Sequence, residues 1–294
     1  MTSLLEKIRS GTFIVTTELT PPKGIDLTDI YAKAQMLRDV VDAFNLTESP
    51  RARMAIDPRS VGKLLLDRGI EPIVQFTARD RNRIAIQADL LGAAALGLTN
   101  FVFMGGDHPK NGDHPDAKPV FDLNTAEMLQ AARSLTQGRD MAGHELKGAP
   151  KLVLGATVNP AAKNFAEEAD NTRRKIDAGA VFLQTQAIYD PAVLERFLDA
   201  VKPDGIALLA GIIPLKSIKM ATWLKTNVPG IVVPESLLAE MQAVSGTDRE
   251  VATGLAIAER TITSVRPLCA GIHVMALGWE HHIPEILRAT GLRP

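Results

Sequence analysis

Short apolar runs alternate along the chain with longer stretches in which apolar residues recur at helical spacing. Each short run is bounded by Gly, Pro or polar residues, a pattern typical of strands buried on both faces of a parallel sheet. The pattern predicts eight strands, at residues 13–18, 43–47, 72–77, 100–104, 151–156, 181–186, 206–212 and 271–277.

Helices are predicted between these strands. Residues 83–96 place Ile84, Leu90 and Leu91 on one apolar face, and residues 165–178 and 192–201 show the same kind of spacing. Asp190 and Pro191 have the residue types that favour a helix cap and a first helical turn. A last helix is expected at residues 283–289.

The spacing of the strands predicts the architecture. The first four begin at residues 13, 43, 72 and 100, about one strand–helix unit apart. Two insertions interrupt the spacing, a loop rich in Gly, Pro and Asp at 105–118 and extra helices at 216–266. We therefore predict an α/β fold, a (βα)8 TIM barrel, with residues 1–294 as a single domain. An open doubly wound sheet is the alternative.

Composition narrows the class of protein. Hydrophobic residues make up 46% of the chain, and 33 Lys and Arg balance 34 Asp and Glu, so no basic excess indicates a nucleic-acid partner. No apolar run reaches membrane-spanning length, and residues 1–10 lack the apolar core of a signal peptide. The single cysteine, Cys269, excludes an intrachain disulfide framework. We expect a soluble, cytoplasmic protein with no membrane partner.

The active site of such a barrel lies at the carboxyl ends of its strands. A polar side chain at one strand end is often a loop cap, but a random apolar repeat would not place many there. The predicted strand ends carry Glu18, Thr47, Thr77, Asp107, Asn159, Gln186, Pro214 and Trp279. This set indicates a polar site at the barrel mouth.

Glu18 is the first candidate for chemistry. Pro21 and Pro22 follow it closely and stiffen the segment that carries it. A carboxyl group that is partly desolvated at a barrel mouth can act as a proton donor. A cap of the following turn is the alternative.

Gly105, Gly106 and Asp107 follow the fourth strand. Two glycines permit close approach of the backbone to a flat or anionic ligand, beside which the carboxylate would lie. Taken alone, this triplet is also common in turns. His108 and His114 show no metal-ligand pattern, so we interpret them as solvated loop residues and expect no metal.

Amide and guanidinium groups complete the candidate site. Gln184 and Gln186 share one face of the sixth strand, and an amide suits a heterocycle because it both donates and accepts; ladder capping is the alternative. Arg79 and Arg81 precede the helix at 83–96, where arginine forks and helix amides can bind a diphosphate. Pairing with neighbouring carboxylates is the alternative for both arginines.

With these positions in view, the chain resembles the methylenetetrahydrofolate reductase family over nearly its whole length. The order and spacing of several segments match together. These are ELTPPKG (18–24), GDHP (106–109), KIDAGA (175–180) with TQ (185–186), GIIP (211–214) and GIHVMAL (271–277). The chain looks closest to the short bacterial members that consist of the catalytic domain only.

The resemblance implies a flavin, FAD rather than FMN, across the strand ends. It also implies electron transfer from NADH or NADPH to 5,10-methylenetetrahydrofolate, which becomes 5-methyltetrahydrofolate. Glu18 matches the family's general acid, Asp107 a carboxylate near pterin and flavin, and Gln186 a substrate-binding amide. The expected substrate site also includes Gln184, Leu277 and Ile218.

Thr47, Gln75, Gly106 and Lys175 match flavin-contacting positions of the family. The expected cofactor site adds Thr77, Arg79, Arg81, Met104, Gly105, Asp107 and Asn159. Two alternatives to this function remain. The chain could act only with a partner within a reductase complex, or the same barrel could transfer a methyl group from folate without a flavin. The sequence leaves open whether the protein forms a homo-oligomer or binds a partner subunit, and in which direction the reaction runs.

Three positions depart from the family pattern. Gly105 stands where many members have an arginine that holds the flavin, and Gln75 where histidine is common. Ile218 stands where some members have an aromatic residue that stacks on NADH and folate. If FAD binds, Arg79 and Arg81 are the expected positive partners of its diphosphate in place of the missing arginine.

Overall fold

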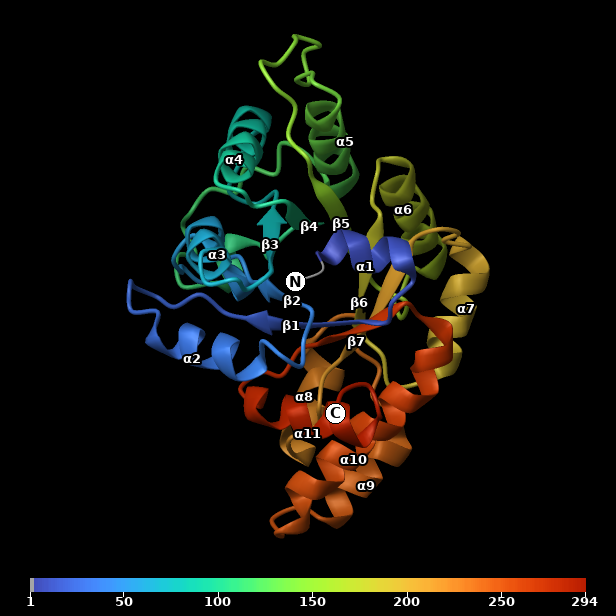
Figure 1. The fold of residues 1–294 in the computed structure, drawn as a ribbon. Helices are drawn as coiled ribbons and strands as arrows, with labels where there is room; N and C mark the ends of the chain where they lie inside the picture. Colours follow the sequence, from blue (N-terminus) through green and yellow to red (C-terminus); the bar gives the residue numbers. More distant parts are fainter. Residues whose placement is uncertain (1–2) are drawn as a thin grey trace.

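Eight parallel strands close into a barrel in chain order, with β1 pairing with both β2 and β8 (Figure 1). The computed structural model describes residues 3–294. The strands are β1 (Ile14–Leu19), β2 (Ala43–Leu46), β3 (Pro72–Thr77), β4 (Asn100–Met104), β5 (Val153–Val158), β6 (Phe182–Ala187), β7 (Ala207–Ile212) and β8 (Gly271–Val274). The predicted (βα)8 barrel is confirmed, and the open sheet is excluded.

The strand ends differ from the prediction by one to three residues at several places. β5 begins and ends two residues later than expected, at Val153 and Val158. β8 ends at Val274 rather than at residue 277. The backbone N–H of Met275 still donates to Ile212 O at 2.8 Å, but Leu277 has a φ of 50°, so the chain turns away there.

Helices surround the barrel, and the first of them lies across its amino end (Figure 1). They are α1 (Leu4–Ser10), α2 (Thr28–Leu37), α3 (Pro58–Leu66), α4 (Arg83–Ala95), α5 (Thr125–Thr136), α6 (Phe165–Asp177), α7 (Pro191–Val201), α8 (Ile218–Asn227), α9 (Glu235–Ala243), α10 (Arg249–Val265) and α11 (Ile283–Ala289). The four predicted helices appear as α4, α6, α7 and α11. The Asp190 carboxylate caps α7 by accepting from Ala192 N at 2.9 Å, as its sequence predicts.

One predicted helix face is wrong in detail. Ile84 was expected on the apolar face of α4, but it is 75% exposed. The buried residues of this helix are Ile86, Leu90 and Ala93. Their spacing of four and three residues defines the inner face, and Ile84 lies outside it in the first turn, next to the Asn82 cap.

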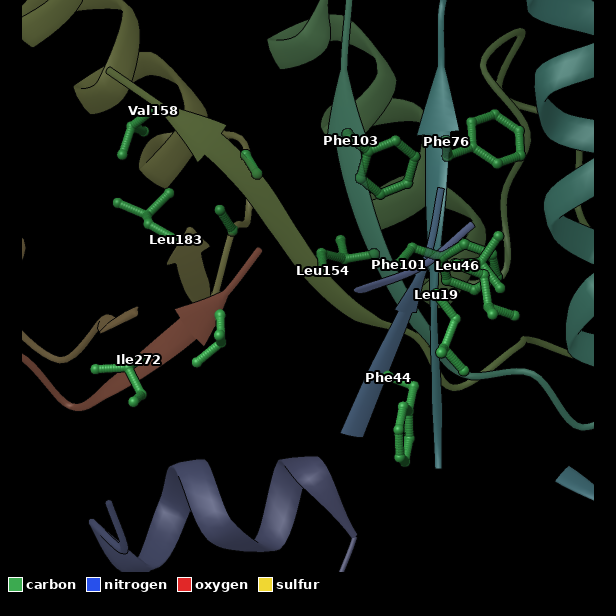
Figure 2. Close-up of a cluster of buried hydrophobic side chains, with 14 of the residues drawn as sticks. Leu19, Phe44, Leu46, Phe76, Phe101, Phe103, Leu154, Val158, Leu183 and Ile272 are labelled. Atoms are coloured by element: carbon green, nitrogen blue, oxygen red, sulfur yellow. The ribbon is translucent and has the colours of Figure 1, made fainter. Parts of the chain in front are cut away.

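The main apolar core lies between the outer face of the barrel and the helices. Figure 2 shows Phe76, Phe101 and Phe103 within it, and the rings of Phe76 and Phe103 have centroids 5.6 Å apart. Phe101 and Phe103 belong to this outer core, whereas Val102 between them belongs to the interior cluster. Strand alternation therefore decides which side chains enter the barrel.

The barrel interior changes from apolar to polar along its axis. Leu4 of α1 packs into the interior cluster with Ile14, Ile73 and Val102, and its N–H donates to Glu71, just before β3. Along β1, the inward-facing residues are Ile14, then Thr16, and then Glu18 at the mouth. Within residues 3–294, no helix has the length and apolar character needed to span a membrane.

Candidate active site at the barrel mouth

A cavity of about 370 Å³ lies at the carboxyl ends of the strands. Strands β1, β3, β4, β5 and β6 and helix α6 each bring at least one predicted site residue to its wall. These residues are Glu18, Gln75, Met104, Asn159, Lys175, Gln184 and Gln186. The structure thus gathers side chains separated by more than half of the chain into one polar cavity.

Glu18 is held at one of its two carboxylate oxygens. Gln75 Nε2 donates to Glu18 Oε1 at 3.0 Å, and His273 Nε2 lies 3.5 Å from the same oxygen. Within residues 3–294, the Oε2 atom accepts no hydrogen bond. Glu18 is therefore anchored through Oε1, and Oε2 is the oxygen available to a ligand.

A buried polar network lies below Glu18. Asn45 and Gln184 exchange two amide hydrogen bonds, at 2.7 and 3.1 Å. His273 Nδ1 lies 2.8 Å from Thr16 Oγ1. His273 was not among the predicted site residues; its only signal in the sequence is a lone polar residue inside an apolar strand run. Because these side chains satisfy one another, they fix the floor of the cavity.

Gln184 and Gln186 differ in surroundings although both line the cavity. Gln184 is 2% exposed and belongs to the buried network. Gln186 Oε1 accepts from Ala187 N at 3.0 Å, next to a register shift between β6 and β7. Of the two amides, Gln186 is therefore the better placed to reach a ligand.

Asp107 contacts a neighbouring loop rather than the cavity wall. Its Oδ2 atom accepts from Arg51 N at 2.8 Å. Gly106 has a φ of 86°, and a Cβ atom there would lie 3.0 Å from Thr77 Cβ, so a side chain would be strained and crowded. A Cβ atom at Gly105 would meet open space.

Two buried hydroxyls fit a polar cofactor. Within residues 3–294, neither Thr47 Oγ1 nor Thr77 Oγ1 finds a hydrogen-bond partner. Buried polar atoms are normally paired, so an unpaired hydroxyl is a position where a ligand can bind. Thr47 lines a cavity at the mouth, and Thr77 packs against Gly106. Both residues are at predicted cofactor positions.

Lys175 supplies a partly compensated positive charge to the same cavity. Its Nζ atom donates to Thr157 O at 2.9 Å and lies 3.8 Å from Glu168 Oε1. Burial lowers the pKa of Lys175 despite Glu168. An anionic group such as a cofactor phosphate would stabilise the ammonium form.

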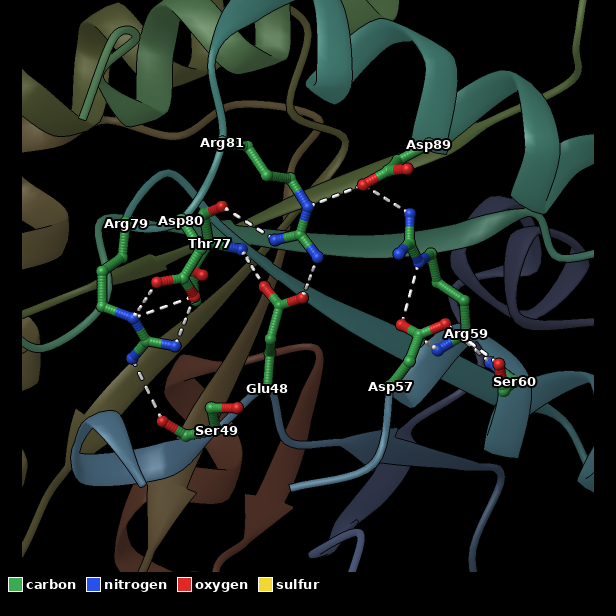
Figure 3. A network of polar contacts seen from close by, with 10 residues as sticks. All are labelled: Glu48, Ser49, Asp57, Arg59, Ser60, Thr77, Arg79, Asp80, Arg81 and Asp89. Carbon is green, nitrogen blue, oxygen red and sulfur yellow. Dashed lines mark hydrogen bonds and ion pairs between the residues drawn. The ribbon is translucent and has the colours of Figure 1, made fainter. Parts of the chain in front are cut away.

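Arg79 and Arg81 are both engaged by carboxylates (Figure 3). Arg79 forks onto Asp80 at 2.7 to 3.0 Å, and Arg81 bonds Glu48 at 2.5 Å and Asp89 at 2.7 Å. These contacts raise the pKa of Arg81 although burial opposes the change. Carboxylate pairing was the alternative interpretation of these residues, and a role in binding FAD stays a prediction.

A second cavity, of about 650 Å³, shares Glu18 with the first. Thr47 and Leu277 line it, together with residues of the loops that follow β1, β2 and β4. Ile218, a predicted substrate residue, packs instead with the separate apolar cluster of α8, α9 and α10 and lines neither cavity. Within residues 3–294, no three His, Cys, Asp or Glu side chains form a candidate metal site.

Comparison with known proteins gives a consistent result. The sequence profile of the methylenetetrahydrofolate reductase family matches residues 3–291. "Methylenetetrahydrofolate reductase 2" of Schizosaccharomyces pombe is 22% identical over 307 residues, which cover 98% of this chain and 47% of that protein. The "5,10-methylenetetrahydrofolate reductase" of Pectobacterium carotovorum is 24% identical, covering 74% of this chain and 71% of the relative. The chain thus spans about half the length of the fungal relative.

Solved structures share the fold. A protein from Clostridium thermocellum, described as binding two copies of 5-methyl-5,6,7,8-tetrahydrofolic acid, superposes with a TM-score of 0.66 at 16% identity, and 98% of each chain is covered. EDTA monooxygenase from Chelativorans sp. BNC1 superposes with a TM-score of 0.58 at 12% identity, covering 96% of this chain and 95% of that chain. At these identities the likeness concerns the fold alone.

Proposed function

The chain belongs to the methylenetetrahydrofolate reductase family, and on that premise we propose that it reduces 5,10-methylenetetrahydrofolate to 5-methyltetrahydrofolate at the barrel mouth. NADH or NADPH is the proposed electron source, and residues 1–294 are proposed to act as one catalytic domain. The observation that carries the proposal is the anchoring of Glu18 by Oε1 beside a polar cavity, while Oε2 accepts no hydrogen bond within residues 3–294.

Glu18 acts as the proton donor in this proposal. The five-membered ring of the substrate opens when N10 takes a proton, the bond from N10 to the methylene carbon breaks, and N5 and that carbon form an iminium. Because Gln75 and His273 both contact Oε1, the proton of the acid form belongs on Oε2. The same group can therefore hold and deliver a proton at one defined atom.

Gln186 and Asp107 support the substrate in different ways. The Gln186 amide lies on the cavity wall, where it can pair with the edge of a pterin. Asp107 adds a negative charge at the mouth, which stabilises a developing cation. Its hydrogen bond to Arg51 N also holds the loop after β2 in place.

FAD is the proposed cofactor, and when bound it supplies the hydride that reduces the iminium carbon. Thr47, Thr77 and Lys175 would hold it, and Gly106 would let the backbone approach it. Purified protein is expected to show flavin absorption bands. A Thr77→Val variant, which removes only the unpaired hydroxyl, is expected to bind FAD more weakly while unfolding at an unchanged denaturant concentration.

The decisive experiment is Glu18→Gln. We expect the rate of methylenetetrahydrofolate reduction to fall by about 10²–10⁴-fold because the amide cannot give a proton. NADH oxidation with an artificial electron acceptor should continue, since that half-reaction needs no such proton. Glu195→Gln, at an exposed position on α7, is the matched control and should behave as wild type.

A near wild-type rate of folate reduction in Glu18→Gln would disprove the assignment. Wild-type protein that binds FAD but oxidises no NADH on its own would favour the partner-dependent alternative. Protein without flavin would favour methyl transfer instead.

A further inference from the structure

The second cavity meets the first at Glu18, which lines both. Its volume is about 650 Å³. Pro21, Pro50 and Met54 give it an apolar wall, while its cationic side chains are Lys23, Arg51 and Arg53. A cavity with one apolar wall and a cationic rim fits a ligand that joins an aromatic ring to anionic groups.

The charges of this cavity do not cancel. Lys23 pairs with Asp113 at 2.6 Å, and this contact is the main reason that the pKa of Asp113 is lowered to about 2. Within residues 3–294, neither Arg51 nor Arg53 forms a salt bridge with a carboxylate. The Arg51 guanidinium lies over the ring of Trp223 instead, 4.8 Å from its centroid. Two guanidinium groups are therefore free to bind an anion.

The loop that carries these arginines has an unusual backbone. Ser49, Arg51 and Ala52 all have φ between 43° and 57°, a region that residues other than glycine seldom adopt. Other parts of the mouth hold it there: Arg79 Nη1 donates to Ser49 O at 3.1 Å, and Asp107 accepts from Arg51 N. Strained backbone that its surroundings fix in this way is characteristic of ligand sites.

The chemistry of Glu18 says which part of the substrate faces this cavity. In the proposed function Glu18 protonates N10, the atom that joins the pterin side of the folate to the aminobenzoyl-glutamate. A proton donor that lines both cavities can therefore reach N10 when the pterin lies in one cavity and the aminobenzoyl-glutamate in the other. The first cavity, with the Gln186 amide, suits the pterin.

We propose that the second cavity binds the aminobenzoyl-glutamate part of the folate, with Arg51 and Arg53 facing its carboxylates. The inference rests on the proposed function. Guanidinium groups pair well with carboxylates because two parallel N–H donors match two oxygens. The phosphates of NADH or NADPH are anions as well, so the test must distinguish the nucleotide from the folate.

The test is calorimetric titration of the FAD-loaded protein with 5-methyltetrahydrofolate. We expect Arg51→Gln and Arg53→Gln each to raise Kd by about tenfold to a hundredfold, as the loss of a charge-assisted hydrogen bond does. Arg53→Lys should restore part of the affinity. Arg196→Gln is the matched control, because Arg196 also lies over an aromatic ring, that of Phe165, and lines neither cavity.

A second ligand isolates the tail. 6-Methyltetrahydropterin has no aminobenzoyl-glutamate, so its Kd should be the same in wild type and in both variants. Equal weakening of both ligands would overturn the inference, as would unchanged Kd for both. Weaker binding of NADH or NADPH with unchanged folate binding would also overturn it and assign the cavity to the nucleotide.

Because the experiment measures binding and not turnover, failure of this inference can be distinguished from failure of the proposed function. Titration needs no turnover, so the expected pattern would support the tail site even if the protein reduced nothing. Wild-type protein that fails to bind the folate would overturn the proposed function together with the inference. Tight folate binding that neither arginine affects would overturn the inference alone.

Discussion

The Nδ1 atom of His273 lies 2.8 Å from Thr16 Oγ1 and 3.5 Å from Gln184 Nε2. The Gln184 amide is oriented by its paired bonds to Asn45, so its Nε2 atom can only donate. We assign His273 Nδ1 as the acceptor in both contacts, which leaves the hydrogen on Nε2, facing Glu18 Oε1. In the proposed function His273 is therefore a positioning residue, because its contact with Oε1 leaves Oε2 of Glu18 for the substrate.

A pair of substitutions tests this role. His273→Leu should lower kcat for folate reduction by about tenfold to a hundredfold, because a displaced general acid loses part of its effect. KM and FAD content should stay unchanged. His273→Gln keeps an amide donor in place of Nε2 and should recover most of the rate. Equal rates for Leu and wild type, or a Gln variant as slow as Leu, would contradict the positioning role.

At the scale of single residues, the sequence predicted which side chains lie at the barrel mouth better than it predicted which atoms they contact. The positions of Glu18 and Gln186 at strand ends were enough to predict that both lie at one mouth, and the family resemblance added Gln75. The sequence could not show that Asp107 accepts from Arg51 N, because the two residues lie on loops after different strands. Such contacts depend on loop conformations, which periodicity does not determine.

Between elements, an ion-pair network connects the end of β2, the end of β3 and α4 (Figure 3). The Glu48 carboxylate accepts from Thr77 N at 2.6 Å and pairs with Arg81, which also bonds Asp89. Glu48 is 7% exposed. Sequence reasoning missed Glu48, although it directly follows the predicted cofactor residue Thr47. The network joins segments whose relative placement only the closed barrel defines.

Removing the charge of Glu48 should destabilise the protein strongly. Glu48→Gln keeps an acceptor for Thr77 N but leaves Arg81 without one partner in a buried position. We expect a loss of about 3 kcal/mol in the free energy of unfolding, measured in urea. Glu145→Gln breaks an exposed pair with Arg139 and should cost less than about 1 kcal/mol. Equal losses in both variants would show that the buried pair contributes little.

Lys175 links α6 to the end of β5, and its buried ammonium group gives stability a pH dependence. Because burial lowers its pKa, the folded protein binds fewer protons at this site than the unfolded chain does. The folded and unfolded states differ in bound protons only at pH values between the lowered pKa of the folded state and the unfolded value of about 10.4. Stability should therefore rise with pH across that window.

Comparison with Lys175→Met isolates this effect. The free energy of unfolding of wild type, relative to that of the variant, should increase as the pH is raised through the window. Chemical denaturation at several alkaline pH values measures it. A constant difference would mean that Lys175 titrates alike in the folded and unfolded states. The variant should also bind FAD more weakly, since it loses the cation of the cavity.

For the whole molecule, strand spacing was sufficient to predict a closed barrel, because units of about 30 residues repeat and each strand is buried on both faces. The division of the mouth into two cavities could not be predicted. One wall of the second cavity is the loop after β2, whose left-handed residues Ser49, Arg51 and Ala52 carry no glycine signal. The loop contacts segments distant in sequence, Arg51 lying over Trp223 of α8.

A substitution at the amino end of the barrel should lower stability without lowering activity, because the candidate active site lies at the other end. Leu4 of α1 is fully buried among interior residues at the amino ends of the strands, far along the barrel axis from Glu18. Leu4→Ala leaves a cavity there and should cost about 2–5 kcal/mol in the free energy of unfolding. The kcat and KM of folded protein should stay near wild type, because the network below Glu18 is untouched.

Leu64→Ala is the control for this substitution, since Leu64 on α3 is 38% exposed and should cost much less. Urea unfolding and steady-state kinetics on the same samples give both readouts. A loss of kcat in Leu4→Ala that matches its loss of stability would mean that the interior transmits the change to the mouth. The apolar layer would then support catalysis directly, because packing at the closed end would help to position Glu18 through Thr16 and His273.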